Sequence, residues 1–358
     1  MSVTKKILFI GPHRPNRSPS QRFRMEQYFP YLKKAGFEFD YSWFINEKDD
    51  AVFYSQGKWP GKLGLFLKAV RVRLNDVLKK NSYDFIFIQR EAFMTGSVFF
   101  EKQLSRAKAK LIYDFDDAIW LDDTSLSNQR LKWLKRPGKI ADIIHMADEV
   151  VAGNNFLAAY ARQFNTNTHV IPTVIDTTVF VPIERKYKDK VSIGWSGSLT
   201  TKKHFEIIIP ALERLKEKFS DKIELIHIGD ANMIYGDLQI ENIQWNFENE
   251  IADLSRIDIG LMPLPDDDWS KGKCGFKALL YMSLAIPPVV SAVGVNTEIV
   301  HDGLNGLLAH SLQDWVDKVS TLITSSDLRG KLGREARKTV EKKFSVSSQW
   351  PKFISLFV

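Results

Sequence analysis

The first half of the chain alternates continuous apolar runs with amphipathic segments. The apolar run at 5–11 ends in a glycine, a pattern that predicts a strand buried on both faces of a parallel sheet. Further strands are predicted at 37–44, 83–89, 110–115, 148–153 and 168–172, with helices at 20–34, 63–80 and 93–107 and from 154 onward. Strands and helices that alternate with short connections are typical of a doubly wound sheet.

The second half repeats this alternation after a charged stretch at 182–190, which is typical of a linker. Strands are predicted at 191–197, 223–230, 242–247, 258–264 and 287–292, with helices at 203–218, 248–256, 275–285, 311–323 and 327–342 and a last helix broken near Pro351. The expected fold class is therefore α/β, with two Rossmann-like, doubly wound parallel-sheet domains facing across a cleft. Ligands of such sheets bind beyond the carboxyl ends of the strands.

The composition is that of a globular protein with two domains. The chain has 358 residues, of which 44% are apolar and 26% charged, a balance that excludes disorder and coiled-coil sequence. The single cysteine, Cys274, cannot form an intramolecular disulfide, which fits a reducing compartment. No apolar window is long enough to span a bilayer, and the N-terminal run is too short for a signal peptide. We therefore expect a cytoplasmic protein.

The formal net charge of +7 favours anionic partners. The sequence contains neither paired zinc ligands nor an RNA-binding aromatic motif, which argues against nucleic acid. The glycine-rich loops of P-loop ATPases and of dinucleotide-binding oxidoreductases are missing as well. A nucleotide, a phosphate and an anionic lipid surface remain as candidate partners.

Two segments of the second half carry the residues that phosphate binding needs. In the first, small residues and lysines coincide at Ser196, Gly197, Ser198, Lys202 and Lys203. Small residues let backbone N–H groups approach an anion, and lysines supply positive charge. The alternative is an ordinary turn between a strand and a helix, with its lysines in solvent.

The second segment lies directly before a predicted apolar helix. Gly272 and Gly275 flank Lys273 and Cys274, and Lys277 falls on the first turn of the helix. A lysine there is unfavourable unless an anion is bound, because the helix N-terminus is already partly positive. The alternative is a solvated lysine. No cysteine–histidine pair is visible, so Cys274 is expected to be a buried small residue and not a nucleophile.

Carboxylates cluster after the strand predicted at 110–115, at Asp114, Asp116 and Asp117. Carboxylates beyond the end of a strand can bind a metal, accept a sugar hydroxyl or act as a base. The alternative is an Asx-type turn that caps a helix.

Arginines cluster after the first predicted strand, at Arg14, Arg17, Arg22 and Arg24. Arg22 and Arg24 fall near the start of the first helix, where a guanidinium can clamp a phosphate or a sugar. The alternative is flexible loop charge, which is the favoured interpretation for Arg14 and Arg17.

Residues 58–80 hold seven basic residues against one acidic residue, Asp76, with apolar side chains interleaved. A basic amphipathic segment of this kind can dock on an anionic membrane surface. The favoured alternative is a surface helix whose apolar face packs on its own sheet.

Four stretches of the sequence resemble motifs of glycosyltransferase family 4 and its relatives. The segments at 170–180 and 192–215 resemble the family's interdomain segment and its phosphate-binding loop, and 147–161 is similar to a motif of its first domain. The segment at 272–309 resembles the family's donor-binding motif and keeps Glu298, Asp302, Gly303, Asn305 and Gly306 in place. The resemblance covers most of the chain and is strongest from about 140 to 309.

The resemblance implies the GT-B fold. It assigns 1–175 to an acceptor-side domain and 176–342 to a nucleotide-sugar-binding domain. It also predicts that a C-terminal helix, 343–358, packs back toward the N-terminal domain. In this scheme Ser196, Gly197, Ser198, Lys202, Lys203, Lys273 and Lys277 bind the donor diphosphate, and Gly272, Cys274, Gly275 and Glu298 bind the nucleotide or the sugar.

The chain departs from the family at one important place. The family has two glutamates eight positions apart that contact the donor, and here Gly272 and Leu280 occupy those positions. A histidine of the family's first domain falls near Asp116. Asp116, Asp117, Arg22 and Arg24 are therefore the expected catalytic-site residues.

The resemblance implies a glycosyltransferase that moves a sugar from a nucleotide diphosphate sugar to a glycan or lipid-linked acceptor, in the synthesis of surface polysaccharide or glycolipid. Retention of configuration is expected, with no metal ion and no cofactor besides the sugar nucleotide. The expected location is cytoplasmic, with a peripheral contact through 58–80 at the inner face of the membrane. Two alternatives are a nucleotide-sugar epimerase of GT-B-like fold and a non-catalytic nucleotide-sugar-binding protein.

Overall fold

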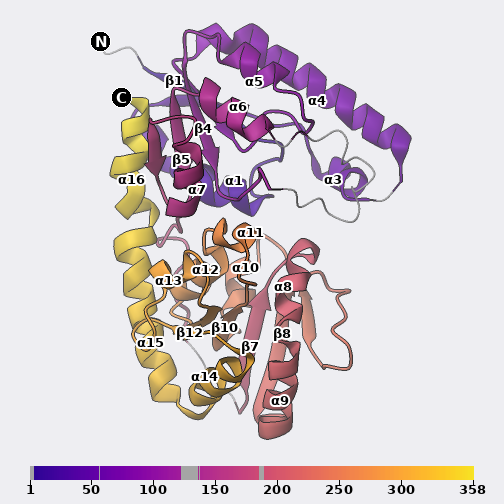
Figure 1. Cartoon of the computed structure of the whole chain (residues 1–358), viewed down its shortest axis with the longest axis vertical. Helices are drawn as coiled ribbons and strands as arrows, with labels where there is room; N and C mark the ends of the chain where they lie inside the picture. The colour runs from indigo at the N-terminus through magenta and orange to yellow at the C-terminus, as the bar shows by residue number, and fades with distance from the viewer. Residues whose placement is uncertain (1–3, 56, 122–135, 137, 185–188) are drawn as a thin grey trace. The chain divides into compact units, whose positions relative to one another are not determined.

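The computed structural model describes residues 4–55, 57–121, 136, 138–184 and 189–358. The chain divides into two compact units, each with its own sheet (Figure 1). Unit 1 comprises residues 1–173 and 350–358, and unit 2 comprises residues 174–349. Part of the predicted linker at 182–190 lies outside the described residues.

Unit 1 is built on a six-stranded parallel sheet with the strand order β2-β1-β3-β4-β5-β6. Its strands are β1 (Lys6–Ile10), β2 (Glu38–Ser42), β3 (Phe85–Gln89), β4 (Lys110–Phe115), β5 (Glu149–Ala152) and β6 (Thr168–Val170). Every residue of β3 is buried, as expected for a central strand covered on both faces. The predicted parallel α/β architecture is confirmed for this half of the chain.

The helices of unit 1 differ from the prediction where prolines intervene. They are α1 (Pro19–Arg24), α2 (Phe29–Lys34), α3 (Glu47–Phe53), α4 (Trp59–Lys79), α5 (Phe99–Leu104), α6 (Lys139–Met146) and α7 (Asn155–Ala161). The single helix predicted at 20–34 is wrong: α1 ends at Arg24, a 3-10 turn covers Glu26–Tyr28, and α2 begins at Phe29 with Pro30 in its first turn. Proline has no N–H to donate to the preceding turn, so it belongs at the start of a helix. Helix α3 was not predicted.

The C-terminal residues 350–358 belong to unit 1, where their aromatic rings enter its core. Phe353 stacks on Tyr28 with ring centroids 3.8 Å apart, and Phe357 meets Phe85 edge to face at 5.4 Å. Helix α16 (Val346–Ile354) continues through Pro351, so the predicted break there is wrong. Packing of the buried rings offsets the hydrogen bond that proline removes.

Unit 2 is built on a second six-stranded parallel sheet with the order β12-β11-β10-β7-β8-β9. Its strands are β7 (Val191–Ser196), β8 (Ile223–Gly229), β9 (Glu241–Gln244), β10 (Ile259–Met262), β11 (Pro288–Ser291) and β12 (Leu307–Ala309). Strand β12 was not predicted. The strand order reverses between β7 and β10, and ligands of doubly wound sheets bind at such a point.

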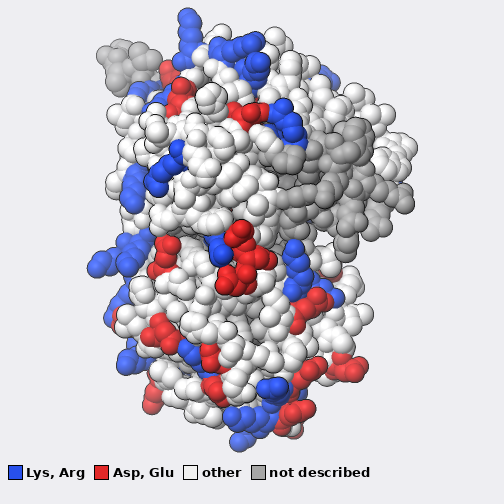
Figure 2. Space-filling view, in the orientation of Figure 1, with Lys and Arg blue, Asp and Glu red and all other residues white. Residues whose placement is uncertain are grey.

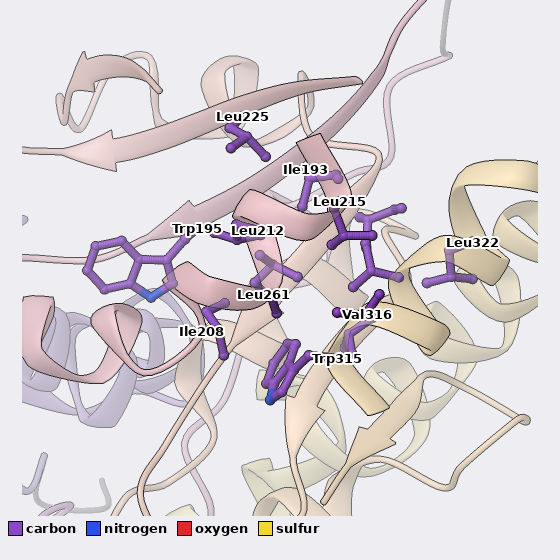
Figure 3. Packing of buried hydrophobic residues seen from close by; sticks show 14 of the residues in the cluster. Ile193, Trp195, Ile208, Leu212, Leu215, Leu225, Leu261, Trp315, Val316 and Leu322 are labelled. Atoms are coloured by element: carbon purple, nitrogen blue, oxygen red, sulfur yellow. The ribbon is translucent and has the colours of Figure 1, made fainter. Parts of the chain in front are cut away.

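Helices cover the sheet of unit 2 and bury a continuous apolar core. They are α8 (Lys202–Glu206), α9 (Ile209–Phe219), α10 (Glu250–Leu254), α11 (Asp268–Lys271), α12 (Phe276–Ser283), α13 (Asn296–Ile299), α14 (Leu312–Thr324) and α15 (Ser326–Thr339). Figure 3 shows Leu212 of α9 and Trp315 of α14 in the same cluster as Ile193 and Leu261 of the central strands. The helix predicted at 203–218 is divided, since Pro210 starts α9.

A close approach between β10 and α12 requires glycine at position 260. A Cβ atom there would lie 2.3 Å from the ring of Tyr281, a fully buried residue of α12. Contacts that short force side chains or backbone to move. The helix that begins with the predicted phosphate-binding residues is therefore seated directly on a central strand.

We predict that Gly260→Ala lowers the free energy of unfolding by about 1–3 kcal/mol, because the methyl group overlaps the ring of Tyr281. Urea denaturation of the full chain measures this change. The matched control is Gly64→Ala in α4, where a Cβ meets no atom within 4 Å. The free energy of unfolding of this control should stay the same or rise by up to about 1 kcal/mol, because alanine has a higher helix propensity than glycine. Equal stability of the two variants would contradict the close packing of α12 on β10.

Candidate active site

The net positive charge of the chain does not by itself mark a site. On the described part of the face shown in Figure 2, Lys and Arg side chains are interspersed with Asp and Glu side chains. The location of an anion site therefore depends on particular lysines and their neighbours.

The loop after β7 is held by hydrogen bonds within unit 2. The backbone N–H of Ser196 donates to the Tyr281 hydroxyl at 2.7 Å, and that of Gly197 donates to the Ile228 carbonyl at 2.9 Å. The Ser198 N–H donates to the Thr201 hydroxyl at 3.1 Å. All three predicted amide donors have partners inside the chain. A phosphate at this loop would replace one of these bonds or bind the neighbouring lysines.

Two buried side chains that the sequence analysis missed shape this loop. Trp195 fills the space beneath Gly197, where a Cβ would lie 2.1 Å from the indole ring. His227 stacks on Trp195, and its Nε2 lies 3.0 Å from the carbonyl oxygen of Gly197. A histidine within the apolar run at 225–228 is the signal that marks this contact.

Lysines from two separate segments converge on His204. His204 is buried in α8, and burial, followed by the charges of Lys277, Lys273 and Lys203, lowers its pKa to about 4. The positive charges of these three lysines therefore all act on one imidazole. The Lys277 Nζ also lies 5.9 Å from the ring centroid of Trp195. The structure thus brings together predicted residues of both phosphate-binding segments.

Lys202 has a carboxylate partner in its own helix. Its Nζ lies 3.4 Å from the carboxylate of Glu206 and 5.5 Å from the ring centroid of Tyr235. A carboxylate one helical turn away already balances its charge. Its predicted contact with the diphosphate stays a prediction.

The segment before α12 combines a buried cysteine with a strained turn. Cys274 is buried, as expected, and its Sγ lies 4.0 Å from the Gly272 carbonyl oxygen. Gly275 has a φ of +69°, a left-handed conformation that favours glycine, and a Cβ there would lie 2.2 Å from Ile299. Leu280 is fully buried, and Glu298 is exposed on α13. The conformation of this turn therefore sets the backbone positions of Lys273 and Lys277.

The carboxylates of unit 1 are held by an arginine that the sequence analysis missed. The Arg90 Nε lies 2.7 Å from Asp116 Oδ1, and its Nη2 lies 3.5 Å from Asp117 Oδ2. Burial raises the pKa of Asp116, but the Arg90 charge and hydrogen bond outweigh burial and hold the pKa below its usual value. Asp116 is thus an ionised hydrogen-bond acceptor and a weak base. Arg90 itself has a φ of +63°, a strained conformation often found at functional sites.

The two predicted arginine clamps are both buried in unit 1. Arg24 Nη2 lies 2.5 Å from Asp114 Oδ1, and its Nη1 donates to the Ile171 carbonyl at 2.5 Å. Burial raises the pKa of Asp114 to about 6 despite Arg24. The Arg22 guanidinium lies 4.8 Å from the ring centroid of Phe23. A phosphate contact of Arg24 would have to compete with Asp114.

Comparisons with known proteins agree with these features. Residues 190–325 match the family model described as glycosyl transferases group 1. No curated protein sequence matches the chain. The fold is similar to that of sucrose-phosphate synthase from Thermosynechococcus elongatus, with a TM-score of 0.74 at 15% identity, covering 99% of this chain and 98% of the other.

Two further structures share the fold. A glycosyltransferase from Rickettsia africae gives a TM-score of 0.68 at 15% identity and covers 99% of this chain and 98% of its own. Anabaena HepE, solved with UDP and glucose, gives a TM-score of 0.64 at 14% identity. The alignment covers 99% of this chain and 100% of the HepE chain. The chain therefore has the GT-B fold throughout, with a group 1 glycosyltransferase domain at residues 190–325.

Proposed function

We propose that this chain transfers a sugar from a nucleotide diphosphate sugar to a glycan or lipid-linked acceptor. The observation that carries the proposal is that the two lysine-bearing segments meet within the residues that match the family model: the Lys277 Nζ lies 5.9 Å from the ring centroid of Trp195, and the Ser196 N–H donates to the Tyr281 hydroxyl at 2.7 Å. HepE, which shares the fold, has been solved with UDP and glucose. A diphosphate is the part of such a donor that needs several positive charges.

In the proposed reaction these lysines stabilise the leaving diphosphate. Negative charge builds up on the diphosphate as the bond to the sugar breaks, and cations fixed in advance lower the energy of that state. The N-terminus of α12 adds partial positive charge beside Lys273 and Lys277. This scheme calls for no metal ion and no further cofactor, and we propose that the sugar keeps its configuration.

The remaining predicted residues receive roles in the same scheme. We assign Gly272, Cys274, Gly275 and Glu298 to the nucleotide or sugar of the donor, and unit 1 to the acceptor side. The carboxylates of Asp116 and Asp117, held by Arg90, are suited to accept hydrogen bonds from sugar hydroxyls.

One observation favours a second candidate function. Leu280 is fully buried where the family has a donor-binding glutamate, which would suit a protein that binds a nucleotide sugar without transferring it. Donor binding without hydrolysis or transfer would support that candidate. A changed donor sugar formed without acceptor would instead identify an epimerase.

We predict that Lys277→Ala lowers turnover of the sugar nucleotide by about 100-fold, because one fixed charge at the leaving diphosphate is lost. Release of nucleoside diphosphate from UDP-, GDP-, ADP- and dTDP-sugars measures turnover, with and without EDTA. The control is Lys338→Ala, an exposed lysine paired with Glu335, which should leave turnover unchanged. Wild-type turnover in Lys277→Ala would contradict the proposed role of this lysine. Loss of wild-type turnover in the presence of EDTA would contradict the proposal that the reaction needs no metal ion.

We further propose that α4 docks on an anionic membrane at the cytoplasmic face. One side of α4 packs inward through Leu65, Ala69 and Arg73, which agrees with the favoured alternative from the sequence. A second side leaves large apolar side chains exposed: Trp59, Leu63, Leu67, Leu74 and Leu78. Their spacing places them along one stripe of the helix, with lysines at both ends.

The chemistry of this stripe fits a lipid surface. Apolar side chains enter the interface while basic residues attract anionic headgroups. Among the described residues, no helix combines the length and the apolar character needed to cross a membrane. The proposed contact is therefore peripheral.

We predict that Leu63→Gln combined with Leu67→Gln weakens vesicle binding by at least about tenfold, because both side chains lose apolar burial in the interface. Flotation with phosphatidylglycerol vesicles measures binding, with phosphatidylcholine vesicles as the uncharged comparison. The control is Ile234→Gln, an exposed apolar residue of unit 2. If the unchanged protein, the double leucine variant and Ile234→Gln all float equally with phosphatidylglycerol vesicles, the proposed membrane contact of the stripe is contradicted.

A further inference from the structure

The loop after β1 contains an arginine pair that the structure holds in place. Arg14 Nη1 and Arg17 Nε lie 2.5 Å and 2.9 Å from the same oxygen of Asp50, Oδ2. The interpretation of these arginines as flexible loop charge is therefore wrong, because Asp50 fixes both of them. Strand β1 lies between β2 and β3, where the strand order of this sheet reverses. Such a reversal is a favoured place for a ligand.

A buried histidine lies beside the arginine pair. The His13 Nε2 lies 3.2 Å from the Tyr54 hydroxyl, and its backbone N–H donates to Gln21 at 2.9 Å. The His13 Nδ1 lies 3.9 Å from Asp50 Oδ1, and neither atom has a hydrogen-bond partner among the described residues. Buried polar atoms are usually satisfied, so the unused hydrogen-bonding capacity of this pair distinguishes it from an ordinary structural contact.

The electrostatics around His13 are positive. Burial, followed by the charge of Arg17, lowers the pKa of His13 to about 4 against the opposing effect of Asp50. Arg14 and Arg90 lower it further. The side chains of Arg14 and Arg17 are 27% and 32% exposed, so solutes can reach both guanidinium groups. An accessible pair of arginines beside an uncharged histidine favours an anionic ligand.

The same segment is joined to the helix with the exposed apolar stripe. Asp50 belongs to α3, and its neighbour Asp49 lies 2.5 Å from the Lys68 Nζ of α4. Tyr54 ends α3 and contacts His13. Helix α3 therefore links the arginine pair to the helix proposed to touch the membrane.

We propose that Arg14 and Arg17 bind a phosphate group of the acceptor substrate. The inference rests on the proposed glycosyltransferase function and names the chemical class of its acceptor. Guanidinium groups form paired hydrogen bonds with phosphate, which offers more acceptor oxygens than the single Asp50 oxygen that the arginines now share. Asp50 holds the pair in position before the phosphate binds.

The test uses inorganic pyrophosphate as the probe, titrated calorimetrically into the full chain carrying K273A and K277A. These two changes remove the proposed diphosphate contacts of unit 2, so that the remaining binding reports on unit 1. Adding R14Q and R17Q should weaken that binding by at least about tenfold. Adding R106Q and R162Q, two exposed arginines of the same unit, should leave it unchanged.

A further variant separates ligand binding from a purely structural role. Asp50→Asn removes the competing negative charge, and the proposal expects pyrophosphate to bind about threefold more tightly. If the arginines only anchor α3, Asp50→Asn and the arginine double variant will weaken binding alike. That result, or an arginine double variant that binds as well as its parent, would overturn the proposal.

Two probes identify the source of the phosphate. Phosphatidylcholine vesicles containing a polyprenyl phosphate represent a lipid-linked acceptor, and glucose 6-phosphate represents a soluble one. Binding of either probe that depends on Arg14 and Arg17 supports the proposal and names the source, and binding of neither contradicts it. Failure of the proposed function would instead appear as sugar-nucleotide turnover that K273A and K277A leave intact.

Discussion

The positive potential that lysines of two separate segments create at one buried imidazole is the constraint on which this account depends. Burial is the largest cause of the depressed pKa of His204, and the positive charges of Lys277, Lys273 and Lys203 depress it further. An anion such as a diphosphate, bound near these lysines, would reduce the positive potential at this imidazole.

Close packing of aromatic rings fixes the backbone near these lysines. Glycine at 197 and 260 lets the rings of Trp195 and Tyr281 pack against the backbone, and the Tyr281 hydroxyl accepts the first N–H of the loop after β7. Tertiary packing thus positions the loop and α12 before any ligand binds. Preorganised charges of this kind stabilise a transition state without further rearrangement.

Buried strands and the two-sheet architecture were predictable from the sequence, because continuous apolar runs are local signals; the role of the lysines in binding phosphate stays a prediction. Strand β12 was missed because its three residues, Leu307–Ala309, include no β-branched residue, unlike the equally short β6. Arg90 and Asp50 were missed because their importance arises from partners far along the chain, Asp116 and Arg14. Sequence spacing cannot show which side chains the sheet brings together at its carboxyl edge.

The most direct measurement is the pKa of His204 by NMR, with and without nucleoside diphosphate. The account predicts a value near 4 in the free chain, where burial and the lysines disfavour the charged imidazole. It predicts a clear rise when UDP, GDP, ADP or dTDP binds, because the diphosphate neutralises the surrounding lysines. A bound nucleotide that leaves the pKa of His204 unchanged would contradict the placement of the diphosphate among these lysines.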